Sequence, residues 1–330
     1  MAPIPLSPAL SVDDANTLLS AENLKGRNAL ITGGASGLGL AIGTAYAEKG
    51  AYVTLVDINE EDGKRHAAGL QAKGLKVQFI TTDVRSWEAQ VAAFKAAIKF
   101  HPRRTLDIVV GGAGTFSEMF LQPDEPAITS LDVDPPKPPT DAWDVNAIGL
   151  AFTAKLAQLY FEMPASASAT EEEGEGAPSQ QGQPKSLLLI ASLAAYFDIP
   201  LMAAYTSSKY GARGLLRNLR PIFAARGHRV NLMAPWIIPT AMTVEWMKMF
   251  RAVGAPEGNI GQAVTAAIRC AADPGVNGRA FCIGPHRIRD LEDDPKGLNG
   301  GKVMNEFLSQ DVAGWAEQEK RMLAMMGFPE

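Results

Sequence analysis

The feature that most constrains the fold is a regular alternation of short apolar runs with longer amphipathic segments, which begins near residue 27. The runs NALIT, AYVTLVD, KVQFITTDV, LDIVVGG, SLLLIAS, HRVNLMAP and GRAFCIG predict strands, and the segments between them predict helices. Strands that are apolar on both faces need helices on both sides of the sheet, as parallel sheets have. The pattern predicts an α/β fold with a single Rossmann-type doubly wound parallel sheet flanked by helices on both faces.

Three segments depart from this alternation. Residues 1–25 read as an N-terminal arm, and the acidic, Pro/Gly-rich stretch 164–185 is expected to be a disordered insertion because it has little to bury. Residues 285–330 read as a tail with one helix, in DVAGWAEQEKRMLAMM. The alternation resumes unchanged after the insertion, so one domain over 26–284 is expected rather than two.

Composition argues against several classes of protein. The net charge of −5 and the pI near 5.5 offer no basic field for nucleic acid. Cys270 and Cys282 form no CxxC pair and the four histidines are scattered, so no metal site is expected. The chain has neither a leader-like start nor an apolar stretch long enough to span a membrane, and a cytoplasmic protein is expected.

A glycine-rich turn follows the first predicted strand. Glycines let the backbone turn tightly and approach a pyrophosphate at the positive end of the next helix. On its own this TGxxxGxG turn is weak support, because helix packing would also explain glycines there. The residues of the turn that we expect at a dinucleotide are Thr32, Gly33, Ser36, Gly37, Leu38 and Gly39.

An acidic residue ends the second predicted strand. Asp57, followed by Ile58, lies about 20 residues after the turn, where a carboxylate can bind ribose hydroxyls and repel a 2'-phosphate. No Arg or Lys lies between Gly33 and Gly39, so NAD is favoured over NADP. The alternative for Asp57 is a helix N-cap.

Tyr205 and Lys209 form a YxxxK pair within a predicted helix, and four-residue spacing puts both on one face. A free phenol has a pKa of about 10, and a nearby ammonium lowers it. Lys209 can therefore tune Tyr205 as a general acid/base. Taken alone, an exposed surface pair explains the spacing equally well.

Two more residues precede this pair in order. Ser192 lies 13 residues before Tyr205, and Asn146 lies in DVNAIG at the start of an earlier long helix predicted over 141–163. With them the sequence resembles the short-chain dehydrogenase/reductase family, over residues 25–284. The resemblance implies an oxidoreductase in which Ser192 polarises the substrate oxygen, Tyr205 exchanges a proton, Lys209 binds the nicotinamide ribose, and Asn146 holds a water in a proton relay.

The same resemblance implies further cofactor contacts. Asp83 and Val84 match the family's adenine-contacting pair. Pro235 begins a segment similar to its PGxxxT motif, in which Ile238 meets the nicotinamide amide through its backbone and Thr240 through its hydroxyl.

Two departures from the family pattern stand out. The family's NNAG is here Gly111, Gly112, Ala113 and Gly114, of which the last three are expected at the cofactor. Without the asparagine contacts, local flexibility is expected to rise. Trp236 replaces the glycine after Pro235 and is expected to narrow the pocket or restrict cofactor entry.

The segment AMTVEWMKMFRAVG, with Trp246 and Phe250, is expected to cover a bulky apolar substrate, although packing on the domain or a partner is an equal alternative. Parts of the chain are similar to fungal hydroxyaverantin dehydrogenases and to the hydroxyprostaglandin dehydrogenase group. This implies NAD-dependent oxidation of an apolar secondary alcohol in secondary metabolism, and a homodimer or homotetramer paired through the two long helices. The alternatives are an NADPH-dependent ketoreductase and a non-redox cyclase or NAD-binding protein on the same scaffold.

Overall fold

The computed structural model describes residues 6–17, 21–116, 127–165, 184–199, 202–294, 300–312 and 314–325. Most of the acidic insertion predicted to be disordered, residues 166–183, lies outside these ranges.

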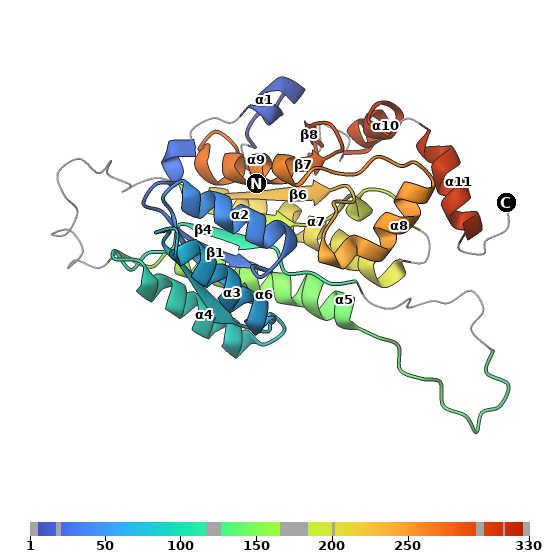
Figure 1. The fold of residues 1–330 in the computed structure, drawn as a ribbon, viewed down its shortest axis with the longest axis horizontal. Helices are drawn as coiled ribbons and strands as arrows, with labels where there is room; N and C mark the ends of the chain where they lie inside the picture. Colours follow the sequence, from blue (N-terminus) through green and yellow to red (C-terminus); the bar gives the residue numbers. More distant parts are fainter. Residues whose placement is uncertain are drawn as a thin grey trace.

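A single sheet runs through the molecule (Figure 1). Its strands are β1 (Asn28–Thr32), β2 (Tyr52–Asp57), β3 (Val77–Thr81), β4 (Ile108–Gly111), β5 (Ser186–Ile190), β6 (Arg229–Pro235), β7 (Ala280–Ile283) and β8 (Ile288–Asp290). They lie in the order β3-β2-β1-β4-β5-β6-β7-β8, and all neighbours are parallel except β7 and β8. The predicted fold class is confirmed.

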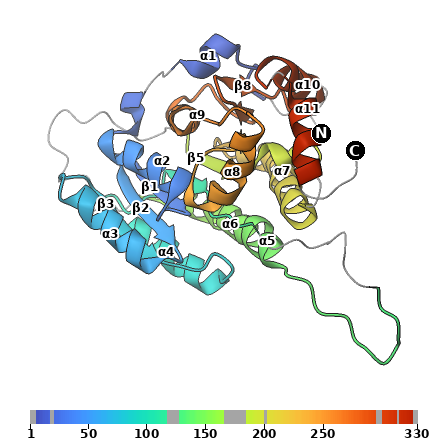
Figure 2. The ribbon, with the colours of Figure 1, turned by 45° about the vertical axis from the view of Figure 1, so that its right-hand side comes forward.

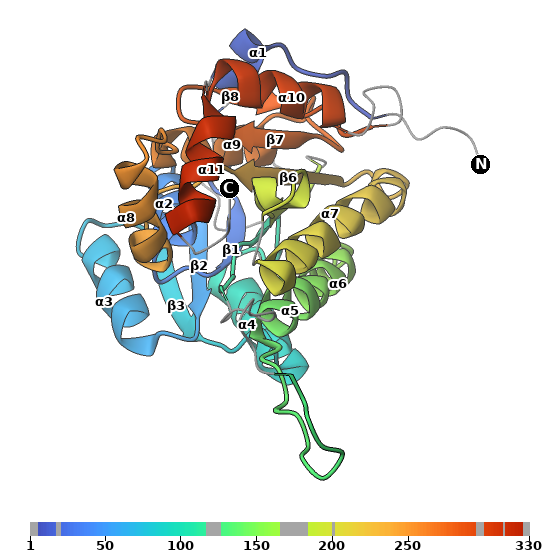
Figure 3. The same ribbon diagram turned by 90° about the vertical axis from the view of Figure 1, so that its right-hand side faces the viewer.

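Helices cover both faces of this sheet (Figure 3). One face carries α2 (Gly37–Glu48), α3 (Glu60–Gln71) and α9 (Ile260–Ala272), and the other carries α4 (Trp87–Phe100), α6 (Leu150–Tyr160) and α7 (Ala203–Ala224). In β1, Leu30 packs into one core while Ala29 and Ile31 pack into the other. Burial on both faces explains why the strands read as continuous apolar runs.

The remaining elements are short or lie near the ends of the chain. They are α1 (Val12–Asn16), η1 (Ala21–Leu24), α5 (Asp141–Trp143), η2 (Asp144–Gly149), η4 (Leu193–Ala195), η5 (Ala241–Thr243), α8 (Val244–Ala252), α10 (Gly301–Gln310) and α11 (Trp315–Met325). The long helix predicted over 141–163 is a continuous helical run from 141 to 160, in which η2 is a π-helical turn between α5 and α6. Such turns occur frequently at functional sites.

The tail contains more structure than the single predicted helix, which corresponds to α11. Strand β8 adds an antiparallel strand to the sheet beyond Gly284, and α10 precedes α11. Helix α1 lies against β8 (Figure 2). There the Asn16 side chain donates to the carbonyl of Ile288 and accepts from its N–H, at 2.9 Å each. The side-chain amide thus pairs with the strand as a neighbouring backbone would.

Among the described residues, no helix has both the length and the apolar character that crossing a membrane requires. The same residues contain no group of three or more His, Cys, Asp or Glu side chains placed to hold a metal ion.

Candidate active site

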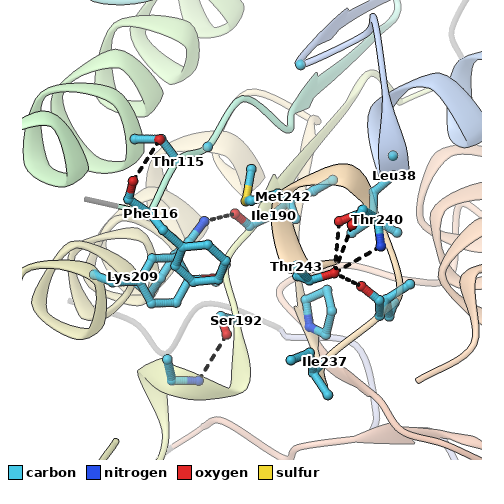
Figure 4. A pocket seen from close by; sticks show the side chains of 18 of the residues that line it. Leu38, Thr115, Phe116, Ile190, Ser192, Lys209, Ile237, Thr240, Met242 and Thr243 are labelled. Atoms are coloured by element: carbon cyan, nitrogen blue, oxygen red, sulfur yellow. Dashed lines mark hydrogen bonds between the residues drawn. The ribbon is translucent and has the colours of Figure 1, made fainter. Parts of the chain in front are cut away.

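A cavity of about 800 Å³ opens at the carboxyl ends of the strands, where open α/β sheets bind ligands. Most of the predicted site residues line it. These are Gly33, Ser36, Gly37, Leu38, Gly39, Asp57, Ile58, Asp83, Val84, Gly112, Ala113, Gly114, Ser192, Tyr205, Lys209, Pro235, Ile238 and Thr240. Figure 4 shows Leu38, Ser192, Lys209 and Thr240 among the side chains around it.

The glycine-rich turn is too tight for side chains. Gly33 has φ +73°, and a Cβ there would lie 2.7 Å from the carbonyl oxygen of Gly112. A Cβ on Gly39 would lie 2.1 Å from the carbonyl oxygen of Gly33. Helix α2 starts at this turn, and its N-cap Ser36 makes no side-chain capping bond. The free N–H groups at the helix start therefore fit an anion such as a pyrophosphate.

Asp57 braces this turn from the end of β2. Its carboxylate accepts from the backbone N–H of Ala35 and from that of Asn59, at 3.0 Å each. Helix α3 is capped by the Asn59 side chain, which accepts from Asp62 N–H, so the N-cap alternative for Asp57 was wrong. Asp57 instead holds a carboxylate at the cavity wall, where ribose hydroxyls can donate to it.

Arg85 also lines the cavity and was not predicted from the sequence. Its guanidinium and backbone N–H bind both carboxylate oxygens of Asp83 at 2.7–3.0 Å. It also reaches Asp141, at 3.4 Å. The carboxylate expected to contact adenine is thus already hydrogen-bonded within the protein.

Tyr205 and Lys209 lie together on α7, as their spacing predicts. The Lys209 Nζ atom is 5.5 Å from the centre of the Tyr205 ring and donates to the Ile190 carbonyl at 3.3 Å. Ser192 lies at the start of η4, where its Oγ accepts from Ala194 N–H at 3.1 Å (Figure 4). The loop after β5 and helix α7 thereby bring a hydroxyl, a phenol and an amine to one wall of the cavity.

The electrostatics of this wall differ from the expectation. The Tyr205 ring keeps some exposure to the cavity, but its hydroxyl is enclosed. Burial raises the pKa of Tyr205 to about 12, and a hydrogen bond with Ser192 acts in the opposite direction. Burial also lowers the pKa of Lys209 to about 8. The expected lowering of the phenol pKa by Lys209 is not found in this arrangement, because desolvation raises this pKa more than the hydrogen bond with Ser192 lowers it.

Asn146 lies beside the cavity rather than on its surface, with only 1% of its area exposed. Its amide oxygen accepts from Thr115 N–H at 2.8 Å, and its nitrogen donates to the Thr115 carbonyl and to Ser208 Oγ at 2.9 and 3.0 Å. The π turn of η2 places the side chain here. Asn146 therefore holds the segment after β4 against α7.

Thr32 lies below the cavity surface. Its Oγ accepts from the N–H groups of Gly112 and Ala113 at 3.0 and 3.2 Å, which ties β1 to the end of β4. Leu150 lies where a side chain on Gly111 would extend, 2.3 Å from an added Cβ. Thr32 and Leu150 thus supply bracing where the family's asparagines are missing.

Ile238 and Thr240 line the cavity after β6, and both are bonded to one neighbour. Thr243 Oγ donates to the Ile238 carbonyl at 2.7 Å and accepts from Thr240 N–H at 2.9 Å. A Cβ on Gly37 would lie 3.3 Å from the Thr240 methyl group, so this segment packs closely on the phosphate turn.

Trp236 connects the cavity to the tail. Its indole N–H donates to the Pro256 carbonyl at 2.8 Å, and the side chain is almost fully buried. Its ring lies 5.7 Å from Phe250, 5.6 Å from Phe307 and 4.9 Å from Trp315, between ring centres. The large residue expected to narrow the pocket is also an anchor for α10 and α11.

Several further residues that line the cavity were not identified from the sequence. Phe116 lies on the Tyr205 ring, with ring centres 4.4 Å apart. Trp315, Glu319 and Met322 of α11 also line the cavity. Their spacing on one helical face was a readable signal, but nothing in the sequence placed α11 near the active site.

Comparison with known proteins agrees with this geometry. The sequence matches the family described as short chain dehydrogenase over residues 27–170 and 175–250. It is 38% identical to a 5'-hydroxyaverantin dehydrogenase from Dothistroma septosporum, over 84% of this chain and 91% of that protein. A 5'-hydroxyaverantin dehydrogenase from Emericella nidulans is 36% identical, over 87% and 94% of the two chains.

Two other similarities bear on cofactor and fold. An NADP-dependent dehydrogenase from Cochliobolus lunatus is 34% identical, over 77% of this chain and 87% of that protein. The crystal structure of a short-chain type dehydrogenase/reductase from Mycobacterium marinum has a TM-score of 0.64 at 21% identity, over 81% of this chain and 97% of that one.

Proposed function

The chain belongs to the short-chain dehydrogenase family and is an oxidoreductase acting on CH–OH groups; from this premise we propose that it oxidises a secondary alcohol of a bulky apolar molecule, with NAD as the hydride acceptor. The observation that carries the proposal is one cavity shared by Tyr205, Ser192, Lys209, the glycine turn and Asp57. The 5'-hydroxyaverantin dehydrogenases support a substrate from secondary metabolism.

The family uses NAD(P), and the residues at the turn fit such a group. The start of α2 would bind the pyrophosphate, Asp57 the adenosine ribose, and Lys209 the nicotinamide ribose. When bound, the nicotinamide supplies the site that accepts or gives the hydride.

The protein's own contribution is proton transfer and orientation. Ser192 donates a hydrogen bond to the substrate oxygen and orients it towards Tyr205. During oxidation the Tyr205 oxygen, in its deprotonated phenolate form, takes the hydroxyl proton, and during reduction the protonated phenol gives a proton to the substrate oxygen. The enclosed wall excludes water from the proton being moved. Asn146 supports this geometry by holding Thr115 and Ser208 in place.

NAD is proposed over NADP because of charge. Among the described residues that line the cavity, the cationic ones are Lys209 and Arg85, and Arg85 is engaged by Asp83. Asp57 presents a negative charge where a 2'-phosphate would lie, which costs binding free energy.

A second candidate is an NADP-dependent ketoreductase. The Cochliobolus lunatus relative bears an NADP-dependent name, and the high pKa of Tyr205 keeps its phenol protonated at neutral pH, as a proton donor to a ketone must be. The two candidates differ in nucleotide preference and in direction.

The test compares NAD and NADP binding by calorimetry for the wild type, Asp57→Asn and a control, Glu61→Gln, on exposed α3 surface. We expect the wild type and the control to bind NAD about 10-fold tighter than NADP or better, and Asp57→Asn to lose that preference. NADP preference in the wild type would favour the ketoreductase. Failure to bind either nucleotide would refute both. Secondary-alcohol oxidation, followed by nicotinamide absorbance with Tyr205→Phe as control, tests the reaction.

We also propose a homo-oligomer paired through η2, α6 and α7. These elements expose apolar side chains, at Ile148, Leu159, Tyr210 and Ile222, each more than 40% exposed. Sedimentation velocity of the wild type and of Ile222→Glu tests this, and a wild-type monomer at micromolar concentration would contradict it.

A further inference from the structure

Helix α11 turns one face towards the active-site cavity. Trp315, Glu319 and Met322 line the cavity and are spaced four and three residues apart, which places them on one side of a helix. The helix lies beside α8 in Figures 1 and 3, and Gln318 donates to the Gly254 carbonyl at 3.3 Å, just after α8. The match to the family ends at residue 250, so α11 lies outside the matched segment.

The cavity between α8, α11 and the segment after β4 has aromatic walls. Trp246 and Phe116 have ring centres 6.2 Å apart, and Phe250 and Trp315 have ring centres 5.9 Å apart. All four line the cavity together with Tyr205. Aromatic faces bind flat aromatic ligands by offset stacking or edge contacts. The substrate end of the cavity therefore suits a flat ring system better than a flexible chain.

Glu319 is the polar exception in this apolar region. Its side chain is half-buried, and burial raises its pKa above the ordinary value for a glutamate. Within the part of the chain that the structure describes, no hydrogen bond or ion pair reaches it. This carboxylate is only partly open to water, and no described protein group donates to it, so a ligand can supply a donor.

The other carboxylates that line the cavity are stabilised by protein donors or by water. Asp57 accepts two backbone N–H groups, and Asp83 and Asp141 are bound by Arg85. Asp198 is exposed, so water satisfies it. Glu319 is thus the cavity carboxylate best placed to contribute to selectivity.

We propose that Glu319 is a specificity-determining residue that accepts a hydrogen bond from a phenolic hydroxyl of a flat aromatic substrate, whose secondary alcohol lies at Ser192 and Tyr205. The inference rests on the proposed function for the position of the alcohol. A phenol is planar, so its ring can pack against the aromatic walls while its hydroxyl donates to the carboxylate.

The test uses two ketones, acetylnaphthalene and its phenolic counterpart with a hydroxyl at the far end of the second ring. Their dissociation constants for the NAD-saturated protein are measured by quenching of tryptophan fluorescence. A charge-assisted hydrogen bond predicts about 10-fold tighter binding of the phenolic ketone by the wild type. Glu319→Leu should bind both ketones equally within about 2-fold, and Glu319→Gln should be intermediate.

The matched control is Glu317→Leu, on the exposed side of the same helix, which should keep the wild-type ratio. Any of three results would overturn the inference: a ratio of the two dissociation constants that Glu319→Leu leaves unchanged, equal wild-type affinities for both ketones, or no binding of either ketone. Oxidation of the two corresponding carbinols is measured in parallel. If the protein binds the phenolic ketone selectively but oxidises neither carbinol, the proposed function is refuted and the role of Glu319 stands. If it oxidises both carbinols with equal kcat/KM, only the role of Glu319 is refuted.

Discussion

The ring of Phe116 lies on the ring of Tyr205, with centres 4.4 Å apart and planes inclined by 42°. Phe116 follows Thr115, whose backbone is bonded on both sides to the Asn146 side chain. The ring that covers the proton-transferring phenol is therefore held in place by Asn146, which lies in η2.

This contact predicts the effect of Phe116→Ala on the phenol. Removing the cover admits water to Tyr205, so the pKa of Tyr205 should fall from about 12 towards its ordinary value, by about one pH unit. Tyrosinate absorbance during an alkaline titration, taken as the difference from the same protein with Tyr205→Phe, measures it. Phe116→Leu keeps an apolar cover and should leave the pKa close to that of the wild type; an equal fall in both variants would contradict the explanation.

Lys209 should destabilise the fold at neutral pH. Burial lowers the pKa of Lys209 from 10.5 to about 8. Between pH 8 and pH 10.5 the unfolded chain therefore binds more protons than the folded chain, and the free energy of unfolding of the wild type rises with pH over this range. Lys209→Met removes the penalty and should raise the free energy of unfolding at pH 7 by about 1–3 kcal/mol while abolishing most activity.

Urea denaturation at pH 7 and at about pH 10 tests the sign, because the stabilisation by Lys209→Met should shrink at the higher pH. Lys73→Met, in the exposed turn just after α3, serves as the control. A variant less stable than the wild type at pH 7 would show that the hydrogen bond to the Ile190 carbonyl outweighs the cost of burial.

A substitution at Thr32 can distinguish two roles for its hydroxyl, which are bracing the backbone at the end of β4 and contacting the cofactor. Thr32→Val removes the acceptor for two backbone N–H groups and should cost about 1–3 kcal/mol of unfolding free energy. Thr32→Ser keeps the hydroxyl and should recover most of it. If Thr32→Val instead kept wild-type stability and lost only NAD affinity, Thr32 would be a direct cofactor contact.

Asp293 ties the tail to the helix that carries Tyr205. It is 1% exposed and accepts from Arg213 and Arg217 at 2.9 Å each and from the Tyr196 hydroxyl at 2.8 Å. Burial alone would raise its pKa, but these donors, Arg213 first, hold the pKa below the ordinary value. Its stabilising contribution is therefore complete above about pH 4 and is lost as pH falls further.

Asp293→Ala should cost about 2–4 kcal/mol in urea denaturation at pH 7, because it leaves buried donors unpaired. It should also make the tail more susceptible to limited proteolysis. Asp134→Ala, on an exposed loop, is the control for a charge lost without a partner. Equal stability of the two variants would show that this network contributes nothing to holding the tail.

The sequence predicted the fold well because each buried strand is apolar on both faces and each helix has a distinct polar side. It also predicted many of the residues that line the cavity, since turn glycines and YxxxK are local patterns. It missed the bracing role of Thr32 because its partners lie on another strand. It missed β8 because Ile288–Asp290 carries two charges in three residues. The direction of the Tyr205 pKa shift could not be read, since burial of its hydroxyl depends on Phe116 and on packing of the whole wall.

The pairing of Asn16 with Ile288 has a consequence for solubility. An edge strand with free N–H and C=O groups is a template on which other chains can add. Here a side-chain amide occupies those groups at Ile288, the first residue of the short edge strand β8. A chain without its first 20 residues should keep its catalytic residues in place but self-associate through the exposed edge of β8. On this expectation the arm protects the protein from aggregation.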